Sequence, residues 1–343
     1  MPVFVIGSPR SGTTLLYDML MSAGGFAIYL GESSIFNVVA PRFGNLAVRK
    51  NREQMWNAWL GSRLFRASGI DPGFIQSKLC ENCRNAGDFM RAIMEEVARN
   101  QNALRWAGNT PEETLYLPLI KWTIPDALFV HVIRDGRDVA LSLSRRRYIK
   151  PFPWRERETA IGAAIYWEWI LKKGRRVGKT LGSDYSEIRF EQLVSDPRST
   201  LRNLSSFLDH ELDYDRIQRT ALGSVSKPNT SFKTQSRQEF NPVERWKTDL
   251  TGKELAKIEE LVGETLTELG YSLASRERLR HRGLGSVSKK LVYQSFFEAK
   301  LWAKNSAIIR AIRPKLTSAE IDRIVVVDDN GPEKIRHLTS EAR

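Results

Sequence analysis

Residues 4–20 read FVIGSPRSGTTLLYDML and contain three local signals in a fixed order. The apolar run Val3–Ile6 predicts a short strand buried inside a parallel sheet. A glycine-containing turn follows at Gly7–Thr14, and the apolar spacing of the next residues predicts a helix from Gly12 to Met21. The first N–H groups of such a helix are unpaired, and its dipole adds a partial positive charge. The stretch therefore predicts an anion site at the end of the first strand.

The spacing within the turn narrows the kind of anion. Gly7 and Gly12 bracket four residues, as in the nucleotide-binding P-loop pattern G-x-x-x-x-G-K-[ST]. Thr13 occupies the position of the lysine, so the ammonium that reaches the β and γ phosphates is missing. Arg10 lies inside the loop and offers a planar fork of donors. The sequence therefore predicts a loop that binds a phosphate group but lacks the lysine needed for nucleoside triphosphate hydrolysis. The alternative is a glycine turn without a ligand.

Alternation of strands and helices predicts an α/β fold: a P-loop-like, doubly wound, mostly parallel sheet flanked by helices. Further strands are predicted at Phe26–Leu30, Leu128–Ile133 and Ser186–Phe190. Helices are predicted at Asp88–Gln101, from Asp138, at Thr159–Leu181 and at 252–269, where Thr251 and Glu254 form a capping-box pattern.

The sequence predicts one large domain followed by a C-terminal extension. We expect one domain over residues 1–275, with a helical insertion at 41–106, and a C-terminal helical extension over 276–343. The extension contains the basic amphipathic stretch KKLVYQSFFEAKLWAKNSAIIRAIRPK at 289–315. Such a stretch is typical of a helix packed on the domain, and a helix that contacts a membrane surface or a partner is the alternative.

Composition limits the class of partner and the compartment. The 53 Lys and Arg against 40 Asp and Glu give a net charge of +13, which favours anionic partners. No apolar run approaches the roughly 20 residues of a membrane-spanning helix. Cleavage of a secretory leader would remove the loop at Gly7, so we expect a cytoplasmic protein. Cys80 and Cys83 lack two further zinc ligands at suitable spacing and are interpreted as free thiols.

A second stretch, HVIRDGRDVALSLSRRR at 131–147, places Arg134 at a strand end and Ser142 eight residues later. Together with the first loop, this stretch resembles the sulfotransferase family that uses 3′-phosphoadenosine 5′-phosphosulfate (PAPS). The resemblance continues through IRFEQLVSDPRSTLRNLSSFL at 188–208 and ERWKTDLTGKELAKIEELVGETLTELGYS at 244–272. The resemblance is closest to the branch that contains tyrosylprotein sulfotransferases and many bacterial sulfotransferases. The 41–106 insertion matches this family poorly, and the chain after Ser275 lies outside the resemblance.

The resemblance implies a binding role for two groups of residues. The 5′-phosphosulfate of PAPS is expected to contact Arg10, Ser11, Gly12, Thr13 and Thr14. The 3′-phosphate, a group absent from ATP, is expected to contact Arg134, Ser142 and Arg146, and Arg245 is expected to close over the nucleotide. For Arg137, the nucleotide and a purely structural ion pair are equal alternatives.

The resemblance also implies a catalytic base. Sulfuryl transfer depends on positioning and charge neutralisation, so Arg10 is expected to stabilise the leaving group, with adenosine 3′,5′-bisphosphate (PAP) as product and no metal ion required. Glu32, in LGESSIF, stands where the protein-tyrosine branch has its base. Asn109 and Phe190 replace a Lys and a Tyr that are common in the family, and His131 is interpreted as a core residue.

The acceptor is not identified by the sequence. A small molecule, saccharide, lipid or peptide would suit a pocket lined by the insertion and the Pro151–Trp154 loop. Aromatic residues that could stack on such an acceptor are Trp56, Trp59, Phe65 and Trp154, and burial in the core is the commoner alternative for such residues. The alternatives are a P-loop kinase or NTPase and a non-catalytic polyanion binder; specific nucleic-acid binding is not expected, and a homodimer stays open.

Overall fold

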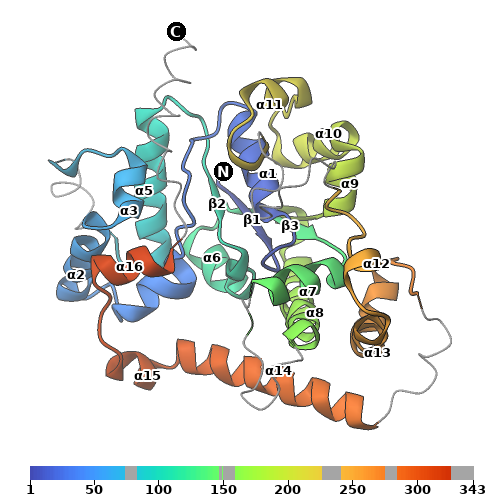
Figure 1. Ribbon diagram of the computed structural model, residues 1–343. Helices are drawn as coiled ribbons and strands as arrows, with labels where there is room; N and C mark the ends of the chain where they lie inside the picture. Colours follow the sequence, from blue (N-terminus) through green and yellow to red (C-terminus); the bar gives the residue numbers. More distant parts are fainter. Residues whose placement is uncertain (74–82, 147–148, 150–158, 226–240, 275–283, 326–343) are drawn as a thin grey trace.

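Figure 1 shows the computed structural model, which describes residues 1–73, 83–146, 149, 159–225, 241–274 and 284–325. A parallel sheet lies at the centre, and helices surround it. The predicted fold class is confirmed. The predicted boundaries of the domain, the insertion and the extension stay predictions.

The described sheet has four strands in the order β2-β1-β3-β4, and every pair of neighbours is parallel. Their bounds are Val3–Gly7 for β1, Ala107–Asn109 for β2, Leu128–Ile133 for β3 and Tyr185–Arg189 for β4. The sequence did not predict β2. It wrongly predicted a strand at Phe26–Leu30, where Phe26 forms only an isolated bridge to Arg105.

Both faces of the sheet are buried, because every residue of β1 and β3, the two central strands, is buried. One face carries Phe4 and Phe129 and packs against α5 (Ala86–Asn100). The other face carries Val5 and Val130 and packs against α1 (Thr13–Ser22), α10 (Pro197–Leu208) and α11 (Tyr214–Thr220). This double covering fixes the carboxyl ends of β1 and β3 side by side.

Further helices complete the layers around the sheet. The helices that follow β3 are α7 (Gly136–Arg145) and α8 (Thr159–Gly178), which pack on each other and on α13 (Gly252–Glu268). The predicted capping box is present, since the Thr251 side chain accepts from the Glu254 N–H and Glu254 accepts from the Thr251 N–H. Shorter helices are α2 (Arg49–Leu60), α3 (Arg63–Ser68), α6 (Leu117–Thr123), α9 (Phe190–Ser195) and α12 (Trp246–Asp249).

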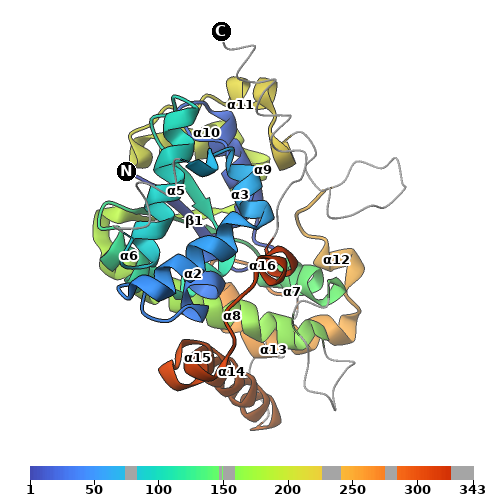
Figure 2. The ribbon, with the colours of Figure 1, turned by 90° about the vertical axis from the view of Figure 1, so that its left-hand side faces the viewer.

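The described part of the C-terminal extension forms three helices that run along the outside of the molecule. They are α14 (Leu284–Asn305), α15 (Ala307–Ile312) and α16 (Ser318–Ile324). α14 crosses α8 on the outside of the molecule, and α16 packs on α2 (Figures 1 and 2). The Arg63 N–H donates to Asp322 at 2.6 Å, and Arg42 donates to the Pro314 carbonyl at 2.5 Å. The extension therefore joins the insertion to the main domain.

Among the described helices, none combines the length and the apolar composition needed to cross a bilayer.

Candidate functional site

The first loop has the geometry of an anion cradle. Gly12 ends the loop with φ 96°, and a Cβ there would lie 2.2 Å from the Phe190 ring. No side chain caps the N-terminus of α1, so its first N–H groups stay available. The Ser11 hydroxyl is buried in the same loop without a hydrogen-bond partner. A tetrahedral anion at this point would satisfy these donors.

A cavity of about 720 Å³ opens beside the loop. Its walls come from the loop, the segments after β2 and β3, and helices on both sides of the sheet. Polar lining residues are Arg10, Thr13, Thr14, Glu32, Ser34, Asn37, Thr110, Glu112, Arg134, Arg146, Tyr214, Gln218 and Ser224. The cavity thus brings the cations Arg10 and Arg134 together with the carboxylates Glu32 and Glu112.

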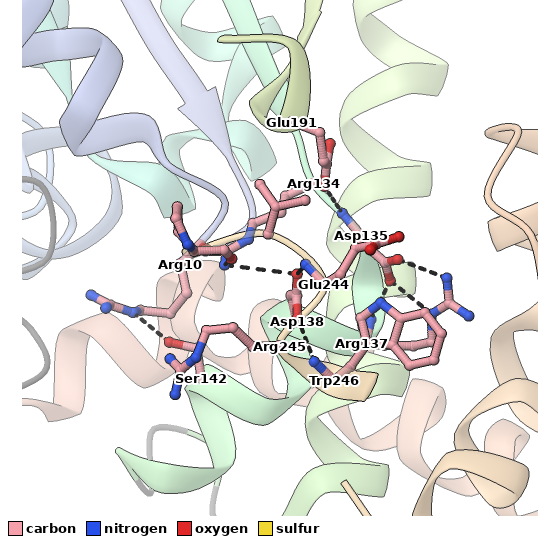
Figure 3. A network of polar contacts seen from close by, with 12 residues as sticks. Arg10, Arg134, Asp135, Arg137, Asp138, Ser142, Glu191, Glu244, Arg245 and Trp246 are labelled. Atoms are coloured by element: carbon pink, nitrogen blue, oxygen red, sulfur yellow. Dashed lines mark hydrogen bonds and ion pairs between the residues drawn. The ribbon is translucent and has the colours of Figure 1, made fainter. Parts of the chain in front are cut away.

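Arg10 and Arg134 both line the cavity and form its cationic end. Figure 3 shows the polar network in which they lie. Arg10 Nε donates to Ser142 Oγ at 3.0 Å, across 132 residues of chain. Arg134 donates to the carbonyl of Arg10 at 3.0 Å and to that of Pro242 at 2.5 Å, and it lies 4.4 Å from the Phe190 ring centre. Its Nε is buried without a partner, so one donor is left for a ligand. Burial lowers the pKa of Arg10 to about 10, with the charges of Arg146 and Arg134 adding to the effect.

Asp138 connects this cationic end to a segment more than one hundred residues later in the chain. Its two carboxylate oxygens accept the N–H groups of Glu244 and Trp246, each at 2.9 Å. These bonds place Arg245 near Arg134. Burial lowers the pKa of Arg134, and the positive charge of Arg245 adds to this effect. Arg245 itself donates to Asp249 at 2.9 Å and is not among the described residues that line the cavity.

Arg137, one residue before Asp138, does not enter the cavity. Its guanidinium donates to both oxygens of Asp135 at 3.0 and 2.7 Å and to Glu259 at 2.7 Å. The plane lies 3.7 Å from the Trp246 ring centre, and only 2% of the side chain is exposed. The structural alternative for Arg137 is therefore confirmed.

Glu32 lines the same cavity, within electrostatic reach of Arg10 and Glu112. Burial and, to a smaller extent, the charge of Glu112 together raise the pKa of Glu32 to about 7, against the opposing effect of Arg10. The neighbouring Glu113 is 1% exposed, and burial raises its pKa to about 8. A carboxyl with a pKa near 7 has the driving force to accept a proton at neutral pH.

Three residues of the cavity region were missed by the sequence interpretation. Glu112 accepts from Asn37 Nδ2 at 3.2 Å, and Lys304, from the end of α14, lies 3.7 Å from its carboxylate. Ile324, from α16, lines the cavity. The acidic pair in GNTPEE was a local signal for Glu112, whereas nothing local connects Lys304 or Ile324 with this site.

Several expectations about surrounding residues are corrected or confirmed by their positions. Trp56 and Trp59 are 2% and 1% exposed, packed on each other and on Phe89, so the expectation that they stack on an acceptor is wrong. Phe65 packs on Trp59 and is not among the described lining residues. Trp154 and Cys80 lie outside the described residues.

The remaining expectations concern buried polar groups. His131 is buried in β3 with Nδ1 2.7 Å from the Tyr185 hydroxyl, which confirms its core role. Burial lowers its pKa to about 4. Asn109 lies at the end of β2 with its Oδ1 buried and unpaired, and Cys83 is buried.

Comparisons with known proteins agree with this geometry. The profile of the sulfotransferase family matches residues 2–214. The chain is 27% identical to protein-tyrosine sulfotransferase A of Caenorhabditis elegans over 279 residues, 78% of this chain and 67% of that protein. It is 26% identical to mouse carbohydrate sulfotransferase 2 over 58% of this chain and only 44% of that protein, less than half its length. The sulfotransferase domain of the Synechococcus PCC 7002 olefin synthase shares the fold, with a TM-score of 0.50 and 19% identity over 80% of this chain and 96% of that domain.

Proposed function

Since the chain belongs to the sulfotransferase family, we propose that it transfers a sulfuryl group from PAPS to a hydroxyl or amine of an acceptor. One observation carries the proposal: a single cavity holds the loop cation Arg10, the strand-end cation Arg134 and the carboxyl Glu32, whose pKa is about 7. Cations suit a doubly phosphorylated donor, and the carboxylate suits an acceptor that must lose a proton.

The residues at the cationic end fit PAPS. The uncapped N-terminus of α1, the unpaired Ser11 hydroxyl and the lining residues Thr13 and Thr14 suit the 5′-phosphosulfate. The unpaired Nε of Arg134 suits the 3′-phosphate, together with Arg146, which also lines the cavity. We assign Ser142 and Arg245 to the same phosphate. The Ser142 hydroxyl would turn to the phosphate when its hydrogen bond with Arg10 is broken, and the Arg245 side chain would close over the nucleotide.

The residues of this chain would divide the chemistry between them. PAPS supplies an activated sulfuryl group when it is bound. Arg10 and the loop N–H groups stabilise the charge that develops on the leaving phosphate, because they are fixed before the reaction begins. Glu32 accepts the proton of the acceptor, which its raised pKa favours at neutral pH.

The acceptor end of the cavity favours a compact, hydrogen-bonding acceptor. Glu32, Ser34, Asn37 and Glu112 supply polar side chains there, and Val38 and Ile324 supply apolar contact. The relatives named for protein tyrosine and for carbohydrate support a hydroxyl acceptor. We propose a phenol, a saccharide or a tyrosine side chain as the acceptor class.

A transfer assay tests the proposed function. PAPS with labelled sulfate is incubated with the protein and a panel of acceptors: 2-naphthol, an N-acetylglucosamine oligomer, a tyrosine peptide and an alkyl amine. We expect label on at least one acceptor, and none when adenosine 5′-phosphosulfate, which lacks the 3′-phosphate, replaces PAPS. No calorimetric binding of PAP, or magnesium-dependent ATP hydrolysis by the pure protein, would contradict the proposal.

Arg134→Ala should weaken PAP binding by about 1–3 kcal/mol, or about 5–150-fold in Kd, because a charge-assisted contact to the 3′-phosphate is lost. Affinity for adenosine 5′-phosphate should change little, because that nucleotide has no 3′-phosphate. Calorimetry with both nucleotides measures the difference.

Arg189→Ala is the matched control for Arg134→Ala. Arg189 also donates to a backbone carbonyl, that of Leu269, and also lies over an aromatic ring, that of Tyr271. It is not among the described residues that line the cavity. Equal losses of PAP affinity in the two variants would show that Arg134 acts only through the fold.

A further inference from the structure

The outer surface of α14 and α15 exposes large apolar side chains. Trp302 is 68% exposed, Ile308 is 71% exposed and Ile312 is 76% exposed. We define the outer apolar face as Leu291, Val292, Phe296, Trp302, Ile308 and Ile312, each of which exceeds 40% exposure. Large apolar side chains exposed together on two successive helices indicate an interaction site in a folded protein.

The opposite side of α14 already has a partner within the chain. Tyr293 and Phe297 are buried there, and the Phe297 ring lies 5.2 Å from Tyr166 and 5.5 Å from Trp169 of α8. At 100° per residue, Leu291 and Trp302 fall on the side of the helix away from Phe297. α14 is therefore apolar on two sides, and only one of them is covered by the described chain.

The charged side chains of α14 lie beside or behind this face. Lys290 contacts Glu168 of α8 at 2.5 Å, and Lys304 contacts Glu112 at 3.7 Å. Glu298 accepts from Trp169 Nε1 at 2.7 Å and contacts Lys173 at 2.9 Å. The one acidic residue of α14 is thus turned toward α8.

The charge around the face favours an anionic occupant. Residues 284–313 contain six Lys and Arg but one acidic residue, Glu298. Lys290 and Lys304 are paired with carboxylates of the domain, which leaves four cations of this segment against Glu298. Two copies of the chain pairing through this face would bring like charges together, with no free carboxylate of α14 to offset them. Anionic headgroups offset this charge, while Trp and aliphatic side chains enter the boundary between headgroups and acyl chains.

We propose that the outer apolar face of α14 and α15 docks on the surface of an anionic lipid bilayer, with Trp302, Ile308 and Ile312 entering the headgroup boundary. Lys300 and Arg313 lie in the same exposed segment and contact the headgroups. The proposal does not depend on the chemistry of the cavity, since α14 presents this face on its far side.

Vesicle cosedimentation of the full chain tests the proposal. The probes are vesicles of phosphatidylcholine alone and of phosphatidylcholine with phosphatidylglycerol, at low and high salt. We expect binding to the anionic vesicles, weakened by salt and much weaker on phosphatidylcholine alone. The variant Trp302→Ser/Ile308→Ser/Ile312→Ser should lower the partition coefficient by about tenfold or more, because three large apolar side chains no longer insert.

Trp122→Ser is the matched control, because Trp122 is 74% exposed but lies on α6, which is not part of the outer apolar face. This variant should bind vesicles as the unchanged protein does. Unchanged thermal unfolding of the triple variant shows that it folds, as expected from the exposure of the three side chains. Absence of binding to anionic vesicles overturns the proposal, as does equal binding by the triple variant, which would indicate adsorption through net charge alone. A dimer in light scattering that the triple variant abolishes, without vesicle binding, would assign the face to a second copy.

Discussion

Glu32→Gln should lower kcat for sulfuryl transfer by about 10²–10⁴-fold, the usual contribution of a general base. The amide keeps the size of the side chain but cannot accept the proton of the acceptor. Affinity for PAP should stay nearly the same, because the Glu32 carboxylate supplies no donor to a phosphate. Steady-state kinetics and calorimetry with PAP separate the two effects.

The pH dependence gives an independent test of the same residue. Burial and Glu112 raise the pKa of Glu32 to about 7, so the carboxylate form increases as pH rises through about 7. Turnover should therefore rise over this range and level off above it, and Glu32→Gln should remove this rise. Glu95→Gln is the control, because Glu95 is an exposed partner of Arg91 on α5. Full activity in Glu32→Gln would eliminate Glu32 as the base.

Arg137→Met should reduce the free energy of unfolding by about 3–5 kcal/mol, as expected when one partner of a buried ion pair is removed. Asp135 and Glu259 would both keep buried negative charges without their main partner. Methionine preserves much of the side-chain volume, so the lower free energy of unfolding reflects the missing charge and not a new cavity. Urea unfolding followed by tryptophan fluorescence measures the change.

Arg198→Met provides the comparison for Arg137→Met. Arg198 also pairs with an aspartate, Asp215, but both side chains are more than half exposed. The unfolding midpoint should hardly move, since exposed pairs contribute little. If Arg137→Met instead weakened PAP binding at unchanged stability, Arg137 would be a nucleotide-binding residue and the structural assignment would be wrong.

The central strands and the first helix could be predicted because their signals are local. β1, β3 and α1 have uninterrupted apolar runs or helical spacing, so each is specified by its own residues. β2 could not be predicted in this way, because Ala107-Gly108-Asn109 has low strand propensity and becomes a strand by pairing with β1. Phe26–Leu30 has the reverse property: its propensity suits a strand, but it pairs only at Phe26.

The candidate site could be predicted only where one segment carries the pattern. The loop and Arg134 follow motifs with fixed spacing, and the structure places Arg10 and Arg134 together. Lys304 and Ile324 reach the cavity region through helix packing far along the chain, which no motif specifies. Trp56 and Trp59 could not be assigned from sequence, since a large aromatic side chain suits both stacking on a ligand and packing in the core. In the structure, both side chains are buried in the core.

The contact of Lys304 with Glu112 and the position of Ile324 have a consequence for shortened forms of the protein. A chain ending before α14 would keep every residue assigned to the donor but lose Lys304, the partner of Glu112, and the lining residue Ile324. We therefore expect a shortened form to bind PAP as the full chain does but to discriminate less well among acceptors.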